Sequence, residues 1–239
     1  MKTLLSAVLL LVLNVLRGRE RTAGLEATIR QLRFELDAER LHRKGTAQAR
    51  HYAGESGHKL HLGCGGFPKE GWVNADLVPQ ADLLLDLRLP NPLPDGSCSL
   101  IYSEHFFEHV AYPGNARELL ADYLRLLEPG GKVSFSVPDG EMALKAYAEG
   151  EEEFFRITKE RWHPKWAETR MAQINYMWRQ DGEHLFIYDK ETLVAELERA
   201  GFVEARRREF DPELDREERR WGSLFVEGVK PSPSPSPSP

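Results

Sequence analysis

Short apolar runs that end in glycine or in an acidic or polar residue recur along the middle of this chain. Leu60 and Leu62 alternate with polar neighbours and lead directly into a run of glycines, as in a β-strand that ends in a tight turn. Similar runs predict strands at residues 72–76, 81–85, 99–102, 132–137, 202–210 and 224–229. With helical patterns at 116–127 and 189–200, they predict an α/β fold whose last two strands form a hairpin at the sheet edge.

Residues 4–16 form an apolar run with one lysine before it and three arginines after it. As a helix this run would span roughly 20 Å, which is less than the roughly 30 Å hydrocarbon core of a bilayer. A membrane anchor or interfacial helix, a signal peptide, and an oligomer-forming or buried helix therefore stay open. The positive charge after the run favours a cytoplasmic location for the rest of the chain.

Leu25, Ile29, Leu32 and Leu36 follow at spacings of four, three and four, which predicts an amphipathic helix or a very short coiled coil. A linker is expected from residue 45 to 57. The predicted organisation is a hydrophobic segment (1–22), an amphipathic helix with linker (23–57), a main domain (58–230) with a helical cap (141–184), and a disordered Pro-Ser tail (231–239). The aromatic residues of the cap region would form either a substrate cap or a cover for the sheet.

Composition limits the kinds of partner. The chain has 239 residues and a net charge of -6. Residues 1–56 carry a net +4, so the remainder carries -10, which argues against a nucleic-acid groove. Only two cysteines occur, Cys64 and Cys98, and their spacing suits neither a disulfide scaffold nor a zinc site.

Polar residues stand where the predicted strands stop. Asp76 ends the second strand, Asp86 follows the third, and Ser103, Glu104 and His105 follow the fourth. Because the carboxyl ends of parallel strands share one edge of a sheet, we expect these residues to surround a ligand crevice there.

The chain resembles the class I methyltransferases that use S-adenosylmethionine, and more narrowly the small methyltransferases of the type 11 group. The resemblance runs from about Lys59 to Val229. It rests on seven landmarks in order: Leu-Gly-Cys-Gly, Val-Asn-Ala-Asp, Asp-Leu-Arg-Leu-Pro, Pro-Asp-Gly-Ser, Ile-Tyr-Ser-Glu-His with Phe-Glu-His-Val, Leu-Glu-Pro-Gly-Gly, and Glu-Thr-Leu before Arg-Ala-Gly-Phe.

The resemblance implies a Rossmann-like, mostly parallel seven-stranded sheet with an antiparallel edge strand, an N-terminal helical extension, and S-adenosylmethionine as cofactor. Backbone amides near Gly63 and Gly65 would approach the methionine part, and Asp76 would accept both ribose hydroxyls. Asp86 and the amide of Leu87 would bind adenine. The implied cofactor-binding residues are Leu62, Gly63, Cys64, Gly65, Asp76, Leu77, Asp86, Leu87, Ser103 and Glu104.

One spacing departs from dinucleotide-binding folds. Asp76 follows Gly63 by only thirteen residues, where roughly twenty accommodate a helix between the strands. Residues 67–71 therefore form a short turn instead of a crossover helix, which argues against an NAD-dependent oxidoreductase.

The expected reaction is methyl transfer to a hydroxyl or similar nucleophile of a small molecule, a sugar or a lipid-linked glycan. His105 or His184 would act as general base, although histidines that merely shape the pocket are an alternative. His109 follows His105 at a metal-like spacing, but no third ligand is evident, so no metal site is expected. A non-catalytic scaffold tethered to a membrane is the alternative function. The sequence leaves the oligomeric state open.

Overall fold

The computed structural model describes residues 23–233. Two compact units meet at residues 40 and 41, inside helix α2 (Ala23–Gln48). The predicted anchor at residues 4–16 and most of the predicted Pro-Ser tail lie outside the described residues. Within the described residues, no helix combines the length and the apolar character needed to cross a membrane.

Helix α2 confirms that the predicted segment is helical but extends to Gln48, so the expected linker is helical at its start. The 3-10 helix η1 (Ala49–Tyr52) follows. Polar side chains explain the extension: Gln48 Oε1 accepts a hydrogen bond from the Leu84 amide at 3.2 Å, and His42 Nδ1 accepts one from the Asp86 amide at 3.2 Å. Residues 41–48 are therefore part of the main unit.

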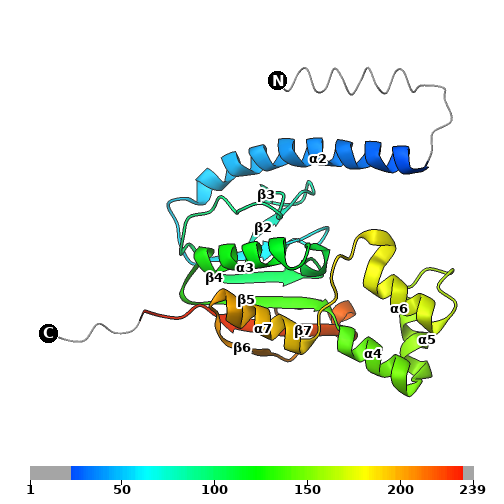
Figure 1. Ribbon diagram of the computed structural model, residues 1–239. Helices are drawn as coiled ribbons and strands as arrows, with labels where there is room; N and C mark the ends of the chain where they lie inside the picture. Colours follow the sequence, from blue (N-terminus) through cyan, green and yellow to red (C-terminus); the bar gives the residue numbers. More distant parts are fainter. Residues whose placement is uncertain (1–22, 234–239) are drawn as a thin grey trace, which may run out of the picture. The chain divides into compact units, whose positions relative to one another are not determined.

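The main unit is built on a seven-stranded sheet in the order β3-β2-β1-β4-β5-β7-β6 (Figure 1). The first five strands in this order are parallel, and β7 is antiparallel to both β5 and β6. This confirms the predicted fold class and the edge hairpin. The strands are β1 (His58–Leu62), β2 (Val73–Asp76), β3 (Leu83–Leu84), β4 (Cys98–Glu104), β5 (Leu127–Pro138), β6 (Val203–Arg207) and β7 (Ser223–Val229).

The bounds of two strands differ from the prediction, and the connection between β1 and β2 agrees with it. Strand β3 has two residues instead of five, and β5 begins at Leu127 because the chain enters it directly from helix α3 (Gly114–Leu126). Between β1 and β2 the chain makes turns only, as the short spacing predicts.

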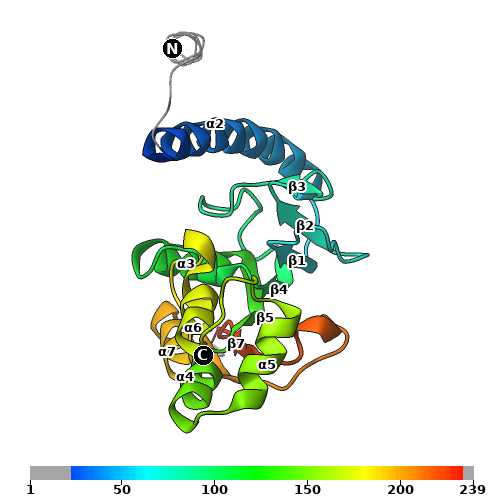
Figure 2. The same ribbon diagram turned by 90° about the vertical axis from the view of Figure 1, so that its right-hand side faces the viewer.

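The two faces of the sheet differ in character. Helices α3 and α7 (Lys190–Ala200) lie on one face, over a core that includes Leu60, Ile101 and Phe135 (Figure 2). The opposite face carries His61, Tyr102 and Ser134 in register. The segment between β6 and β7 covers two of these side chains: the Tyr102 hydroxyl donates to Asp215 at 2.9 Å, and Arg208 Nε donates to the Ser134 hydroxyl at 2.8 Å. Hydrogen bonds therefore bury a sheet face that carries polar side chains.

The predicted cap is helical and has its own small core. It consists of α4 (Gly140–Glu149), α5 (Glu152–Arg161) and α6 (Arg170–Arg179). Phe154, Phe155 and Ile174 are buried together with alanines of α4, whereas Trp166 is exposed. Some aromatic side chains of this region therefore form the core of the cap, and others are available to line a pocket.

Candidate functional site

Two backbone amides of the glycine loop after β1 (residues 63–66) donate hydrogen bonds to other groups of the chain. The amide of Gly63 donates to the Ala75 carbonyl at 3.0 Å, and the amide of Gly65 donates to Asp76 Oδ2 at 2.9 Å. Both glycines have positive φ. The Gly63 amide is thus used within the fold, and a Cβ at Gly63 would stand 2.6 Å from Cβ of Phe106, so this glycine makes room for a side chain of the protein.

Asp76 and Gly65 are brought together as expected, on the open side of the loop. A Cβ at Gly65 would meet nothing within 4 Å. Asp76 is part-exposed and accepts from the amides of Gly65 and Leu77, one on each carboxylate oxygen. Each oxygen of a carboxylate has capacity for a second donor. The ribose end of S-adenosylmethionine therefore fits this position.

Asp86, which is expected to bind adenine, is paired with a side chain of its own chain. Arg88 holds both of its oxygens, with Nε at 2.9 Å from Oδ1 and Nη2 at 2.7 Å from Oδ2. Burial alone would raise the pKa of Asp86, but the hydrogen bonds from Arg88 outweigh it and keep the pKa below its ordinary value. Leu62, Asp86 and Leu87 line one shared cavity of about 10 Å³, which has room for no more than a water molecule.

Ser103 and Glu104, the last residues of β4, and His105, which follows them, have three different environments. The Ser103 hydroxyl is buried and without a hydrogen-bond partner among residues 23–233. Glu104 is not open to a ligand, because Arg216 Nε and the Tyr102 hydroxyl both donate to its carboxylate. His105 has a φ of +50°, and its Nε2 lies 2.8 Å from the Ser223 hydroxyl. A non-glycine residue in this conformation is uncommon and is often found at functional sites.

Sequence reasoning missed the segment between β6 and β7. Asp215 is buried there and accepts from Arg208 through both terminal nitrogens, each at 2.6 Å, and from the Tyr102 hydroxyl at 2.9 Å. Arg216 lies over the ring of Phe67, 3.8 Å from its centroid, beside the glycine loop. In the sequence these residues belong to an unremarkable charged stretch, and no local pattern distinguishes the buried ones.

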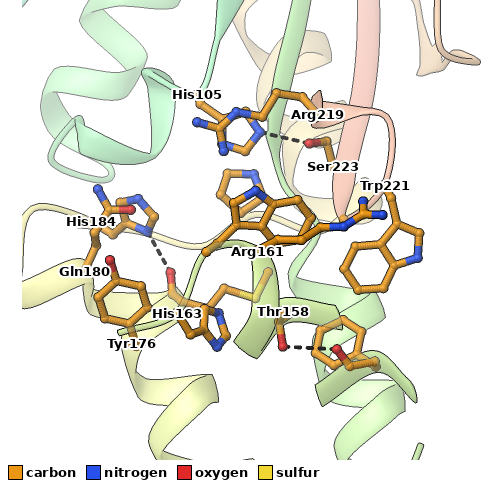
Figure 3. A pocket seen from close by; sticks show the side chains of 15 residues that line it. His105, Thr158, Arg161, His163, Tyr176, Gln180, His184, Arg219, Trp221 and Ser223 are labelled. Atoms are coloured by element: carbon orange, nitrogen blue, oxygen red, sulfur yellow. Dashed lines mark hydrogen bonds between the residues drawn. The ribbon is translucent and has the colours of Figure 1, made fainter. Parts of the chain in front are cut away.

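A cavity of about 350 Å³ lies at the carboxyl ends of β4 and β5, beneath α5 and α6 (Figure 3). Both predicted catalytic histidines, His105 and His184, line it, and Trp162 and Trp221 stack with ring centroids 5.5 Å apart. Its lining residues are His105, Pro138, Phe154, Thr158, Arg161, Trp162, His163, Tyr176, Met177, Gln180, His184, Arg219, Trp221, Gly222 and Ser223.

Burial dominates the electrostatics of this cavity. It lowers the pKa of His184, which keeps the ring neutral near pH 7. It also lowers the pKa of Arg219, and the nearby charge of Arg216 adds to the effect. Among the residues that the structure describes, neither Arg161 nor Arg219 forms an ion pair with a carboxylate, so the cavity carries positive charge.

Comparison with known proteins gives one family match and several similar structures. A family model described as a methyltransferase domain matches residues 31–204. A search of curated proteins gives no match. Solved structures that are similar include an S-adenosylmethionine-dependent methyltransferase from Mesorhizobium loti, at 21% identity over 76% of this chain and 95% of that one, with a TM-score of 0.45.

Two further structures are similar at 16% identity and a TM-score of 0.46. One is a SAM-dependent methyltransferase from Archaeoglobus fulgidus, covering 82% of this chain and 99% of that one. The other is described as a possible exported protein from Bordetella parapertussis, and the match covers 80% of this chain and 68% of that one. The family match confirms the resemblance and S-adenosylmethionine as the expected cofactor. Because that match covers more than half of its length, this chain belongs to the methyltransferase domain family.

Proposed function

We propose that this chain transfers a methyl group from S-adenosylmethionine to a hydroxyl or similar nucleophile of a small molecule, a sugar or a lipid-linked glycan. One observation supports this most: the open Gly65–Asp76 loop and the 350 Å³ cavity lie at the same edge of the sheet. In a parallel sheet, the carboxyl ends of β1, β2, β4 and β5 all face that edge. A cofactor at the loop and an acceptor in the cavity would thus be neighbours.

The side chains have separate roles in this proposal. Asp76 and the loop at Gly65 hold the ribose, and the cavity orients the acceptor and excludes water. S-adenosylmethionine supplies a methyl group already activated by its sulfonium. His105, whose Nε2 lies 2.8 Å from the Ser223 hydroxyl, is positioned to take the proton of an acceptor hydroxyl.

The positive charge of the cavity supports an acceptor that carries an anionic group. Arg161 lies 5.8 Å from the ring centroid of Trp162, and Arg219 is part-buried beside Trp221. Guanidinium groups bind phosphate and carboxylate with paired hydrogen bonds, and aromatic faces pack against apolar ring surfaces. A sugar phosphate or a phosphate-linked glycan combines both features.

Calorimetric titration of S-adenosylmethionine into the full chain tests the proposal. Binding at micromolar concentrations is expected. No heat at high micromolar concentrations would favour the alternative, a non-catalytic scaffold with a methyltransferase fold, for which the closed cavity at Asp86 is the supporting observation.

Product analysis with methyl-labelled cofactor identifies the acceptor. Extracts and membranes incubated with the chain should yield a labelled, anionic, non-protein product. Arg219→Gln should reduce its labelling while cofactor binding is retained, whereas Lys145→Gln, which alters an exposed ion pair of α4, should not. Label only in protein or nucleic acid would contradict the proposed acceptor class.

A further inference from the structure

A second cluster of chemically active side chains forms where η2 (Phe107–His109) meets the chain after α6. The carbonyl of Glu108 accepts hydrogen bonds from the amides of Leu185 at 2.8 Å and Phe186 at 3.2 Å. These bonds fix His184 beside Glu108. The two segments are far apart in the sequence, and the backbone contact is what joins them.

The Glu108 carboxylate lacks the partners that a buried charge requires. It is fully buried, and neither of its oxygens has a hydrogen-bond partner among the described residues. His105 Nδ1 lies 3.4 Å from Oε1, which is longer than an ordinary hydrogen bond. Burying a carboxylate without compensation is strongly unfavourable, so a cation beside it would stabilise the fold.

Two imidazoles, those of His109 and His184, adjoin this carboxylate. Nδ1 of His109 lies 3.1 Å from the Glu183 carbonyl, and Nδ1 of His184 lies 2.7 Å from the Met177 carbonyl. A carbonyl only accepts, so each Nδ1 carries the hydrogen, and each neutral ring has its lone pair on Nε2. Nε2 of His184 is 4.0 Å from Oε1 of Glu108. The His184 lone pair and the Glu108 carboxylate are therefore two acceptors that face each other, and the ring of His109 lies beside them, 4.8 Å from that of His184 between centroids.

We propose that Glu108, His109 and His184 bind a divalent transition-metal ion of the Zn²⁺ type. Their ligand atoms all lie within 4.8 Å of one another. Two imidazoles and a glutamate are a ligand set of catalytic zinc sites, in which ligand atoms stand about 3.4 Å apart around the ion, so binding would draw the three side chains together by up to about 1.4 Å. The carbonyls of Glu183 and Met177 act as the outer partners that orient metal-binding histidines.

The site adjoins the cavity, because His184 belongs to both and His105 approaches Glu108 from the cavity side. A fourth coordination position would be filled by His105 Nδ1 or left to the acceptor. If the proposed methyl transfer is correct, an ion there would lower the pKa of an acceptor hydroxyl and so generate the nucleophile. This last step rests on the proposed function, whereas the metal site does not.

Two basic side chains near Glu108 would compete with this explanation. A hydrogen bond from His105, whose Nδ1 is 3.4 Å from Oε1, or the charge of Arg219 would compensate the carboxylate without any metal. These alternatives predict a chain that binds no Zn²⁺ or Co²⁺ at this place, so metal binding separates them from the proposal.

The test is metal binding by the chelator-treated full chain, followed by calorimetry and by the visible spectrum of Co²⁺. We expect one equivalent of Zn²⁺ or Co²⁺ to bind, with Mg²⁺ and Ca²⁺ much weaker, because those ions prefer oxygen ligands. Glu108→Gln, His109→Gln and His184→Gln should each weaken Zn²⁺ binding by at least about a hundredfold. His163→Gln, a histidine of the same cavity that is bonded to Gln173, should leave binding unchanged.

Absence of Zn²⁺ and Co²⁺ binding by the chelated wild-type chain would overturn the proposal. So would binding that all three ligand variants retain. Part-exposed His109 provides a ligand variant that should fold even if the variant of fully buried Glu108 does not. S-adenosylmethionine binding by the metal-free chain is measured in parallel, so that loss of the metal site and loss of the proposed function are told apart.

Discussion

Nε2 of His184 lies 4.0 Å from Oε1 of Glu108, in the interior behind the cavity. His184 therefore differs from a freely titrating general base. Its Nδ1 is bonded to a backbone carbonyl, and its Nε2 is directed at a buried carboxylate. Of the two histidines predicted for catalysis, His105 is the better candidate for proton transfer, and His184 is the better candidate for holding an ion.

Asp76→Ala should weaken S-adenosylmethionine binding by about ten- to a hundredfold, because hydrogen bonds to a charged group contribute roughly 1.5 to 3 kcal/mol. Calorimetry measures the affinity, and circular dichroism checks that the fold survives. Asp95→Asn serves as the control, since Asp95 is an exposed partner of Arg125. Unchanged affinity in a folded Asp76→Ala variant would remove Asp76 from the site.

Gly63→Ala and Gly65→Ala should differ in their cost to stability. Both place a side chain at positive φ, but only the Cβ at Gly63 collides with Phe106. We expect Gly63→Ala to lower the free energy of unfolding by about 2 to 4 kcal/mol and Gly65→Ala by about 1 kcal/mol. Urea denaturation measures both. Equal losses would show that the Phe106 contact is unimportant.

Asp215→Asn should strongly destabilise the chain. The Asp215 side chain is fully buried against Arg208, so the substitution leaves a buried guanidinium without its counter-charge, at a cost of about 3 to 5 kcal/mol. Glu217→Gln, which breaks an exposed pair with Arg220, should cost less than about 1 kcal/mol. Comparable urea midpoints for the two variants would contradict the structural role assigned to residues 208–222.

Stability should fall as the pH drops from 6.5 to about 4, in part because of His61. Burial lowers the pKa of His61 from 6.5 to about 4, and the charge of Lys69 adds to the effect. In that window the unfolded chain binds a proton that the folded chain does not, which favours unfolding by up to about 3 kcal/mol at the acid end.

The test substitutes phenylalanine, which keeps a ring beside Tyr102. His61→Phe should flatten the dependence of the unfolding free energy on pH between 6.5 and 4. His51→Gln is the control because His51 is exposed, and its pH dependence should match that of the wild type. An unaltered slope in His61→Phe would show that His61 titrates normally in the folded chain.

Much of the fold could be predicted from local pattern. The seven strands and the turn at residues 67–71 follow from apolar alternation and from glycine placement, both of which act over a few residues. The contact between Gly65 and Asp76 was also predictable, because adjacent parallel strands bring their ends together. The extension of α2 to Gln48 was not, because it depends on hydrogen bonds to the strand-end backbone at Leu84.

The roles of the charged residues were predicted less well. Asp86 and Glu104 stand at strand ends, as ligand-binding carboxylates would, yet Arg88 holds the first and Arg216 the second. The position in a strand fixes only where the Cα of a residue lies. Which cation pairs with its side chain depends on the path of a loop, and Arg216, the partner of Glu104, lies in a loop more than a hundred residues further along the chain.

The sequence by itself determined that this chain is an α/β protein with a glycine loop and Asp76 at one sheet edge, because burial patterns and turn residues act locally. Only the tertiary structure decided that His184 meets Glu108 and that two arginines enter one cavity. Such contacts join segments that are far apart in the sequence, so no local pattern predicts them. They form only when the backbone packs, and for that reason the sequence alone did not group Glu108 and His184 with His109 as proposed metal ligands.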